Sequence, residues 1–354
     1  MDNKKPIIGI TQGDPSGVGL ELIIKVFSDE NIYKYCTPVL YANPKTFVAW
    51  KKHLALQEPM YTAVSSASEA KPGKLNLVVS SDANLELSIG KASDVSGLEA
   101  LKSLDKAISD VNHLQALVTA PIDKSTVAPH SANFTGHTGY LAEAFGKSHY
   151  AMILASEDLR VALVTEHVPI TELGKHLSQD KIEQKIEVVY ESLRNDFNVI
   201  KPRIAVLGLN PHAGDNGLLG KEEESMIVPA IQMHFKRGKL VYGPYSADSF
   251  FGGGNYKNFD AVIAMYHDQG LIPFKTLAFM DGVNVTAGLP IIRTSPDHGT
   301  AYDIAGSGVA DPSSFRAAIY DAIHLVRNRN QFAEDFANPL DYAELRRERF
   351  RIDF

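Results

Sequence analysis

Residues 6–27 have the sequence PIIGITQGDPSGVGLELIIKVF. The β-branched apolar run Pro6–Thr11 predicts a strand, the glycine-rich segment Gln12–Gly19 predicts a loop, and Leu20–Phe27 predicts a helix. A strand that enters a helix through a short loop is the repeating unit of a parallel α/β sheet. These residues therefore predict the fold class.

The same unit recurs along most of the chain. Short apolar runs predict further strands, and amphipathic segments between them predict helices. The predicted strands are 38–41, 75–79, 114–119, 161–165, 203–209 and 261–266, and the predicted helices are 96–108, 181–197 and 222–236. This alternation favours an α/β fold with a parallel sheet.

Composition excludes several classes of protein. The 354 residues suggest about two domains, and the 44% hydrophobic and 22% charged residues are typical of a globular chain. A net charge of −7 argues against nucleic acid as a partner. No apolar run approaches the roughly 18 residues of a membrane span. We therefore expect a cytoplasmic protein without a membrane partner. The chain has a single cysteine, Cys36, so any metal ion would be bound mainly by nitrogen and oxygen atoms.

Three histidines follow three predicted strands. His167, His212 and His267 each come shortly after an apolar run. Ligands of open α/β sheets bind at the carboxyl ends of the strands, so three imidazoles there could share one divalent cation with an open position. Any one of them alone is explained as well by hydrogen bonds to loop carbonyls, but the three together favour a metal site. The nearby carboxylates Asp248 and Asp268 could admit a harder ion than imidazole prefers.

Further polar residues stand in glycine-rich surroundings. His137 and Thr138 lie between glycines, and Thr138 is expected to cap a helix over 141–145, whose N-terminus could also bind an anion. Lys275, Asn284 and Arg293 lie in a Gly- and Pro-rich segment of low charge. Arg and Lys there could bind phosphate or carboxylate, or could be solvated loop residues, and spacing alone leaves both interpretations open.

Two loops are candidates for a nucleotide. Gly13, Gly17 and Gly19 fit neither the dinucleotide-binding fingerprint nor the P-loop, and a tight turn explains them as well as a phosphate cradle does. The second candidate is the polar loop 297–306, which contains the sequences DHGTA and DIAG.

Taken in order, a set of motifs resembles the 4-hydroxythreonine-4-phosphate dehydrogenase family of vitamin B6 biosynthesis (the PdxA family). The motifs are GDPSGVG at 13–19, TAPIDK at 119–124, GHT at 136–138, HVP at 167–169, GLNPHAG at 208–214, YHDQG at 266–270, GLP at 288–290, RTS at 293–295 and DHGTA at 297–301. They span nearly the whole chain, and the ordered set is specific for that family.

The resemblance implies an architecture. It is that of isocitrate and isopropylmalate dehydrogenases, with two α/β/α domains and a cleft between them. We place the first domain at 1–130 plus 290–354, on the cofactor side, and the second at 131–289, with the metal and dimer contacts. The resemblance also implies a homodimer with its active site at the subunit interface, where one metal histidine comes from the partner.

The resemblance further assigns roles to residues. The implied ligands of a divalent metal, zinc rather than cobalt or magnesium, are His167, His212 and His267. The implied substrate-binding residues are His137, Thr138, Lys275, Asn284 and Arg293. The implied residues for NAD or NADP are Asp297, His298, Gly299, Thr300 and Asp303. Proton transfer falls to His137, Lys275, Asp248 or Asp268, which the sequence does not rank.

The implied reaction is oxidation of 4-phosphohydroxy-L-threonine to a β-keto acid that decarboxylates to 3-amino-2-oxopropyl phosphate. Two departures concern substrate choice: Gly139 stands where the family usually has an acidic residue, and Asp215 replaces the usual Glu. One alternative is a 4-phospho-D-threonate or 4-phospho-D-erythronate dehydrogenase of the same family. The other is a metal-dependent hydrolase with three histidine ligands, which would need no nicotinamide.

Overall fold

The computed structural model describes residues 5–85, 88–131, 134–278 and 282–338. Within these ranges a single sheet of twelve strands has the order β3-β4-β2-β1-β5-β12-β11-β6-β7-β10-β8-β9. The strands are β1 (Ile7–Thr11), β2 (Thr37–Ala42), β3 (Tyr61–Val64), β4 (Leu75–Val79), β5 (Ala116–Thr119), β6 (Ala151–Ala155), β7 (Arg160–Leu163), β8 (Arg203–Leu207), β9 (Leu240–Tyr245), β10 (Ala261–Ala264), β11 (Val283–Ala287) and β12 (Ile292–Pro296).

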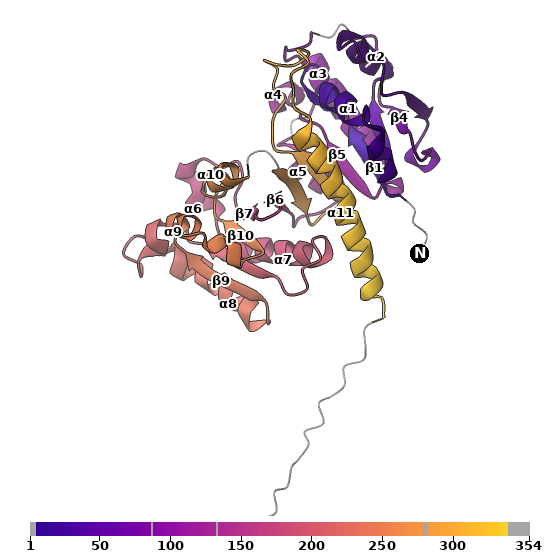
Figure 1. The fold of residues 1–354 in the computed structure, drawn as a ribbon. Coiled ribbons are helices and arrows are strands. Elements are labelled where there is room, and N and C mark those ends of the chain that lie inside the picture. The colour runs from indigo at the N-terminus through magenta and orange to yellow at the C-terminus, as the bar shows by residue number, and fades with distance from the viewer. Residues whose placement is uncertain (1–4, 86–87, 132–133, 279–281, 339–354) are drawn as a thin grey trace, which may run out of the picture.

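Helices cover the sheet (Figure 1). They are α1 (Gly19–Phe27), α2 (Pro44–His53), α3 (Asp94–Ser109), α4 (Lys124–Val127), α5 (His137–Ala144), α6 (Leu173–His176), α7 (Gln179–Asn195), α8 (Val228–Lys236), α9 (Ala247–Gly252), α10 (His267–Leu277) and α11 (Ser313–Asp335). Serine side chains fix the starts of two predicted helices, because Ser93 caps α3 and Ser178 caps α7. None of the helices in the described ranges is long and apolar enough to cross a membrane.

The predicted α/β class is confirmed, but the sheet is not parallel throughout. β3, β4, β2, β1, β5 and β12 pair in parallel, and so do β7, β10, β8 and β9. Between these two parts, β11 pairs antiparallel with both β12 and β6, and β6 pairs antiparallel with β7. β11 can turn directly into β12 because Gly288 adopts φ +87°. The two domain boundaries stay a prediction, since one continuous sheet runs through both parts.

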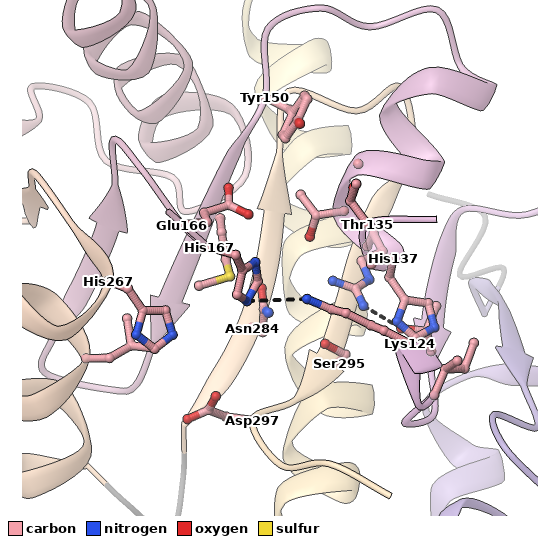
Figure 2. Close-up of a pocket in the computed structure, with 18 of the residues that line it drawn as sticks. Lys124, Thr135, His137, Tyr150, Glu166, His167, His267, Asn284, Ser295 and Asp297 are labelled. Atoms are coloured by element: carbon pink, nitrogen blue, oxygen red, sulfur yellow. Dashed lines mark hydrogen bonds between the residues drawn. The ribbon is translucent and has the colours of Figure 1, made fainter. Parts of the chain in front are cut away.

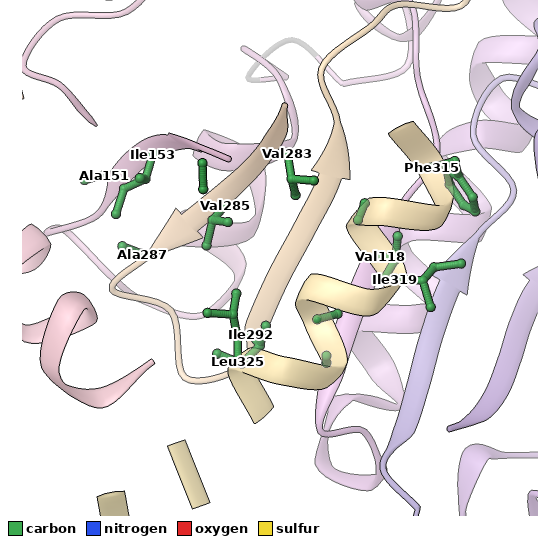
Figure 3. Packing of buried hydrophobic residues seen from close by; sticks show 14 of the residues in the cluster. Val118, Ala151, Ile153, Val283, Val285, Ala287, Ile292, Phe315, Ile319 and Leu325 are labelled. Atoms are coloured by element: carbon green, nitrogen blue, oxygen red, sulfur yellow. The ribbon is translucent and has the colours of Figure 1, made fainter. Parts of the chain in front are cut away.

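A long helix packs along the middle of the sheet. α11 contacts β5, β11 and β12 and also reaches α1 and α7. Figure 3 shows Phe315 and Ile319 of this helix beside Val118 of β5, and Leu325 near Ile292 of β12. Each such buried side chain contributes about 2 kcal/mol by leaving water. The helix therefore fastens the antiparallel middle strands to the first part of the sheet.

Candidate active site

A pocket of ≈ 620 Å³ opens at the carboxyl ends of β5, β7, β10 and β12. Its size is typical of a small-molecule site. From the predicted site residues it collects His137, Thr138, His167, His267, Lys275, Asn284, Arg293, Asp297, His298 and Gly299. Figure 2 shows how side chains from both parts of the sheet face one another across it.

Two of the three predicted metal ligands lie together. The ring centroids of His167 and His267 are 5.8 Å apart, because β7 and β10 are parallel neighbours. The Nδ1 atom of His267 lies 2.7 Å from the Asp268 carboxylate. A carboxylate on one ring nitrogen orients the imidazole and leaves Nε2 for a metal. This pair fits part of a nitrogen-rich metal site, with Asp268 as the orienting group.

His212 does not line this pocket, although β8 lies beside β10 and ends at the same edge of the sheet. The buried carboxylate of Glu223 accepts hydrogen bonds from the backbone N–H groups of Leu209 and Asn210, both at 2.8 Å. With the backbone held by Glu223, β8 ends at Leu207, two residues before its predicted end. From His212 onward several residues have a left-handed backbone conformation, and the loop turns away from the pocket. In the described ranges, no three His, Cys, Asp or Glu side chains of this chain are grouped to hold a metal.

Asp248 also lies outside the pocket lining, in α9. Its carboxylate is exposed and accepts a 2.6 Å hydrogen bond from the Ser246 hydroxyl. That bond, and less strongly the nearby His212, hold the pKa of Asp248 below its usual range. The predicted proton-transfer role of Asp248 therefore has no support within this subunit's pocket. Asp248 instead lies near His212, which is also outside the pocket lining.

Arg293 is a buried cation with neutral partners. Only 2% of its surface is exposed, and its guanidinium donates to the hydroxyls of Thr119 (2.6 Å) and Thr286 (3.1 Å). Its Nε atom has no partner in the described part of the chain. Burial lowers the pKa of Arg293 to about 9. A desolvated guanidinium that faces a pocket and lacks a bonded carboxylate is suited to bind an anion.

His137 lies next to this cation. Burial, together with Arg293 and Lys124, holds the pKa of His137 well below its usual 6.5, so the imidazole is neutral. Its Nε2 atom is buried without a partner among the described residues. The prediction that Thr138 caps a helix is wrong: α5 begins at His137, and the Thr138 hydroxyl instead lies 3.3 Å from that of Thr286. The helix starts earlier because Gly136 supplies the positive φ of the preceding turn.

The substitution His137→Asn is expected to flatten the acid side of the stability profile. As the pH falls through about 6.5, the unfolded chain takes up a proton that the folded imidazole, with its lowered pKa, binds only at lower pH. This histidine therefore lowers the free energy of unfolding, by at most about 1.4 kcal/mol per pH unit. Urea unfolding at about pH 7.5 and about pH 5.5 measures the effect. An equal loss in variant and wild type would show that His137 is protonated in the folded protein.

Polar groups on one side of the pocket lead into the predicted cofactor loop. The Nζ atom of Lys275 lies 3.1 Å from the carboxylate of Asp297, whose pKa is raised by burial. Asp297, His298 and Gly299 line the pocket, whereas Thr300 and Asp303 do not. The Thr300 carbonyl instead accepts from the Val18 N–H at 2.9 Å. The loop therefore starts at the pocket and continues toward the N-terminal glycine-rich segment.

That glycine-rich segment packs against backbone rather than lining the pocket. A Cβ atom on Gly13 would lie 2.5 Å from the Pro121 carbonyl oxygen, and one on Gly17 would lie 2.8 Å from that of Thr300. Asp14 also stabilises the contact between this segment and the loop, because its carboxylate accepts a hydrogen bond of 2.8 Å from the Tyr302 hydroxyl. These distances favour the tight-turn interpretation over a phosphate cradle.

The sequence suggests no role for Lys124, Glu166 or Lys185, yet all three line the pocket. The Nζ atom of Lys124 lies 3.5 Å from His167 Nε2, as Figure 2 shows. Glu166 and Lys185 are 3.7 Å apart. Only sequence position could have pointed to two of these residues, because Lys124 ends the TAPIDK motif and Glu166 directly precedes His167.

Comparisons with known proteins agree with one another. The sequence matches the family described as "Pyridoxal phosphate biosynthetic protein PdxA" over residues 34–322. It is 47% identical over 343 residues to a 4-hydroxythreonine-4-phosphate dehydrogenase of Bacteroides thetaiotaomicron (96% of this chain, 94% of the relative). It is 40% identical over 328 residues to a putative D-threonate 4-phosphate dehydrogenase of Oceanobacillus iheyensis (91% and 98%). The crystal structure of 4-hydroxythreonine-4-phosphate dehydrogenase from Klebsiella pneumoniae has a TM-score of 0.81 at 35% identity (92% and 99%).

Proposed function

Because the chain belongs to the PdxA family of pyridoxal phosphate biosynthetic proteins, we propose that it oxidises 4-hydroxythreonine 4-phosphate with NAD or NADP. The β-keto acid formed would lose carbon dioxide to give 3-amino-2-oxopropyl phosphate. One observation carries the proposal: the buried guanidinium of Arg293, which has no bonded carboxylate, faces a pocket of the right size for a phosphorylated amino acid.

The pocket residues divide the work of binding. Arg293 and Lys275 would hold anionic groups of the substrate, with the Thr138 hydroxyl beside them. The buried Oδ1 atom of Asn284 has no partner in the described ranges and would accept a hydrogen bond from the substrate's ammonium or hydroxyl group. The unpartnered Nε atom of Arg293 and Oδ1 atom of Asn284 would thus each bind a polar group of the proposed substrate.

His137 is the proton acceptor that we propose for the oxidation step. A neutral imidazole can take a proton, and the low pKa of His137 keeps it neutral. Lys275 is a weaker candidate because its ammonium is already paired with Asp297. Asp297–Gly299 line the pocket and would hold NAD(P) there, which when bound supplies a hydride acceptor.

A divalent cation, zinc in preference to cobalt or magnesium, would be held by His167, His267 and His212 of the partner subunit. When bound, it would polarise the substrate hydroxyl and later the carbonyl. The segments that carry the three histidines also expose apolar side chains: Ile170 is 73% exposed, Leu218 78% and Ile272 64%. Exposed apolar side chains on these three segments, together with a metal site that the described residues of one subunit leave incomplete, support a homodimer with the site at its interface.

Formation of NADH or NADPH at 340 nm tests the proposal directly. The zinc-loaded protein is expected to oxidise 4-hydroxythreonine 4-phosphate in preference to D-threonate 4-phosphate and D-erythronate 4-phosphate. Similarity to the putative D-threonate 4-phosphate dehydrogenase favours D-threonate 4-phosphate as the alternative substrate. Absence of reduced cofactor with all three compounds would refute the dehydrogenase assignment and favour the hydrolase alternative.

A further inference from the structure

The proposed function leaves one pocket carboxylate, Glu166, without a role. Its backbone is fixed at the strand end where the pocket opens, because the preceding Thr165 donates to the Met265 carbonyl through its N–H at 3.2 Å and its hydroxyl at 2.7 Å. Figure 2 shows Glu166 beside His167 at the pocket. Its side chain is 20% exposed, so the carboxylate is partly desolvated but can still meet a bound ligand.

Lys185 of α7 lies next to Glu166 without occupying it. The buried Nζ atom of Lys185 donates a 2.7 Å hydrogen bond to the Tyr150 carbonyl and lies 5.0 Å from the centroid of the Tyr150 ring. The same Nζ atom is 3.7 Å from the Glu166 carboxylate, which suits an ion pair but is too long for a hydrogen bond. The carboxylate oxygens of Glu166 therefore remain able to accept hydrogen bonds from a ligand.

Acidic groups are scarce among the described residues that line the pocket. Only Glu166 and Asp297 carry a carboxylate there, and Asp297 is paired with Lys275 at 3.1 Å. A Cβ atom on Gly139 would lie 2.6 Å from Thr135 Oγ1, so this position leaves no room for another acidic side chain. The cationic side chains of the lining are Lys124, Lys181, Lys185, Lys275 and Arg293. The pocket thus offers several groups to anions and one available carboxylate to a cation.

The proposed substrate has the complementary charges. 4-Hydroxythreonine 4-phosphate carries two anionic groups, the phosphate and the carboxylate, and one cationic group, the ammonium. D-Threonate 4-phosphate and D-erythronate 4-phosphate carry a hydroxyl in place of that ammonium. A hydrogen bond between two charged groups is stronger than one from a neutral hydroxyl, and a site built to pair with a polar group discriminates against an analogue that lacks it.

We propose that Glu166 binds the ammonium group of the substrate and so selects the phosphorylated amino acid over the phosphorylated sugar acids. The inference rests on the proposed function, since it takes the substrate from there. It leaves the Oδ1 atom of Asn284 for the substrate hydroxyl. Glu166 is thus a specificity-determining residue.

Calorimetry on the zinc-loaded protein tests this with two ligands. One is 4-hydroxythreonine 4-phosphate, and the other is its analogue with a hydroxyl in place of the amino group and the same configuration at both carbons. Glu166→Gln keeps the shape of the side chain and removes its charge, so it should weaken binding of the amino acid by roughly 10- to 100-fold. It should bind the analogue at least as tightly as wild type, because it removes a repulsion of the analogue's anionic groups.

Two further variants serve as controls. Glu166→Asp keeps a carboxylate and should retain part of the preference for the amino acid. Glu157→Gln removes the same charge from the turn between β6 and β7, where Glu157 is exposed and does not line the pocket. It should bind both ligands like wild type. Wild-type affinity of Glu166→Gln for the analogue also verifies that this variant folds.

Two results would overturn the inference: wild-type affinity of Glu166→Gln for the amino acid, or equal weakening of both ligands. The outcome is separable from that of the proposed function. A protein that oxidises 4-hydroxythreonine 4-phosphate while Glu166→Gln keeps the wild-type preference would refute the role of Glu166 alone. A protein that binds the amino acid through Glu166 yet forms neither NADH nor NADPH would refute the proposed function alone.

Discussion

Mixing two inactive variants, His167→Ala and His212→Ala, is expected to restore about a quarter of wild-type activity. Each variant alone should lose activity by at least about a thousandfold, because each removes one imidazole from the proposed metal site. His167 faces this subunit's pocket, whereas His212 turns outward. In a mixed dimer, one of the two sites then keeps His167 and receives an intact His212 of the partner subunit.

The control pairs His167→Ala with His267→Ala. Both residues line the same pocket, so neither site of that mixed dimer is intact and no activity should return. Zinc content per subunit, measured by mass spectrometry after subunit exchange, should follow activity in both mixtures. If the His167→Ala and His212→Ala mixture stays inactive although mixed dimers form, His212 does not act across the interface.

Arg293→Met is expected to make the protein more stable and almost inactive. The buried guanidinium is held by two threonine hydroxyls, without a bonded carboxylate to offset its desolvation. Glu166 favours the charged form of Arg293, but the cost of burial is larger. Replacing this incompletely compensated buried charge by an apolar side chain of similar volume should raise the free energy of unfolding by about 1–2 kcal/mol. Loss of the anion contact should lower kcat/KM by about a thousandfold.

Urea unfolding with and without inorganic phosphate separates the two effects. Phosphate should stabilise the wild type through binding to the folded state and should leave Arg293→Met unchanged. Thr286→Val is the control, because it removes one neutral partner of the guanidinium and keeps the charge. A destabilised Arg293→Met would mean that Arg293 serves the fold rather than the substrate.

The sequence analysis predicted β1, β2, β4, β5, β7, β8 and β10, but it missed the edge strands β3 and β9 and the middle strands β6, β11 and β12. β11 and β12 carry Asn284 and Arg293 into the pocket, and these polar residues interrupt the apolar pattern that identifies a buried strand. β6 is a five-residue apolar run, the same length as the correctly predicted β4, so its pattern alone would have allowed a strand prediction. The polar residues Asn284 and Arg293, which line the pocket, are therefore also the reason that the apolar pattern did not identify β11 and β12 as strands.

The proximity of two predicted residues could be anticipated where strand order alone sets their position. His167 and His267 meet because their strands are parallel neighbours, and the family identified from the ordered motifs is confirmed by the match over residues 34–322. His212 differs because its position depends on Glu223, eleven residues farther along the chain, which bonds the loop backbone. The sequence next to His212 does not indicate that Glu223 binds the backbone of this loop.

The late return of the chain to β5 has a consequence during synthesis. β5 pairs with β1 on one side, but its other neighbour, β12, begins only at Ile292. At typical translation rates, the edge of β5 stays unpaired for roughly 10 to 35 s after it leaves the ribosome. An uncovered strand edge is a template for pairing with another nascent chain. Newly made molecules should therefore depend on chaperones, and slower translation of the last third should raise the aggregated fraction.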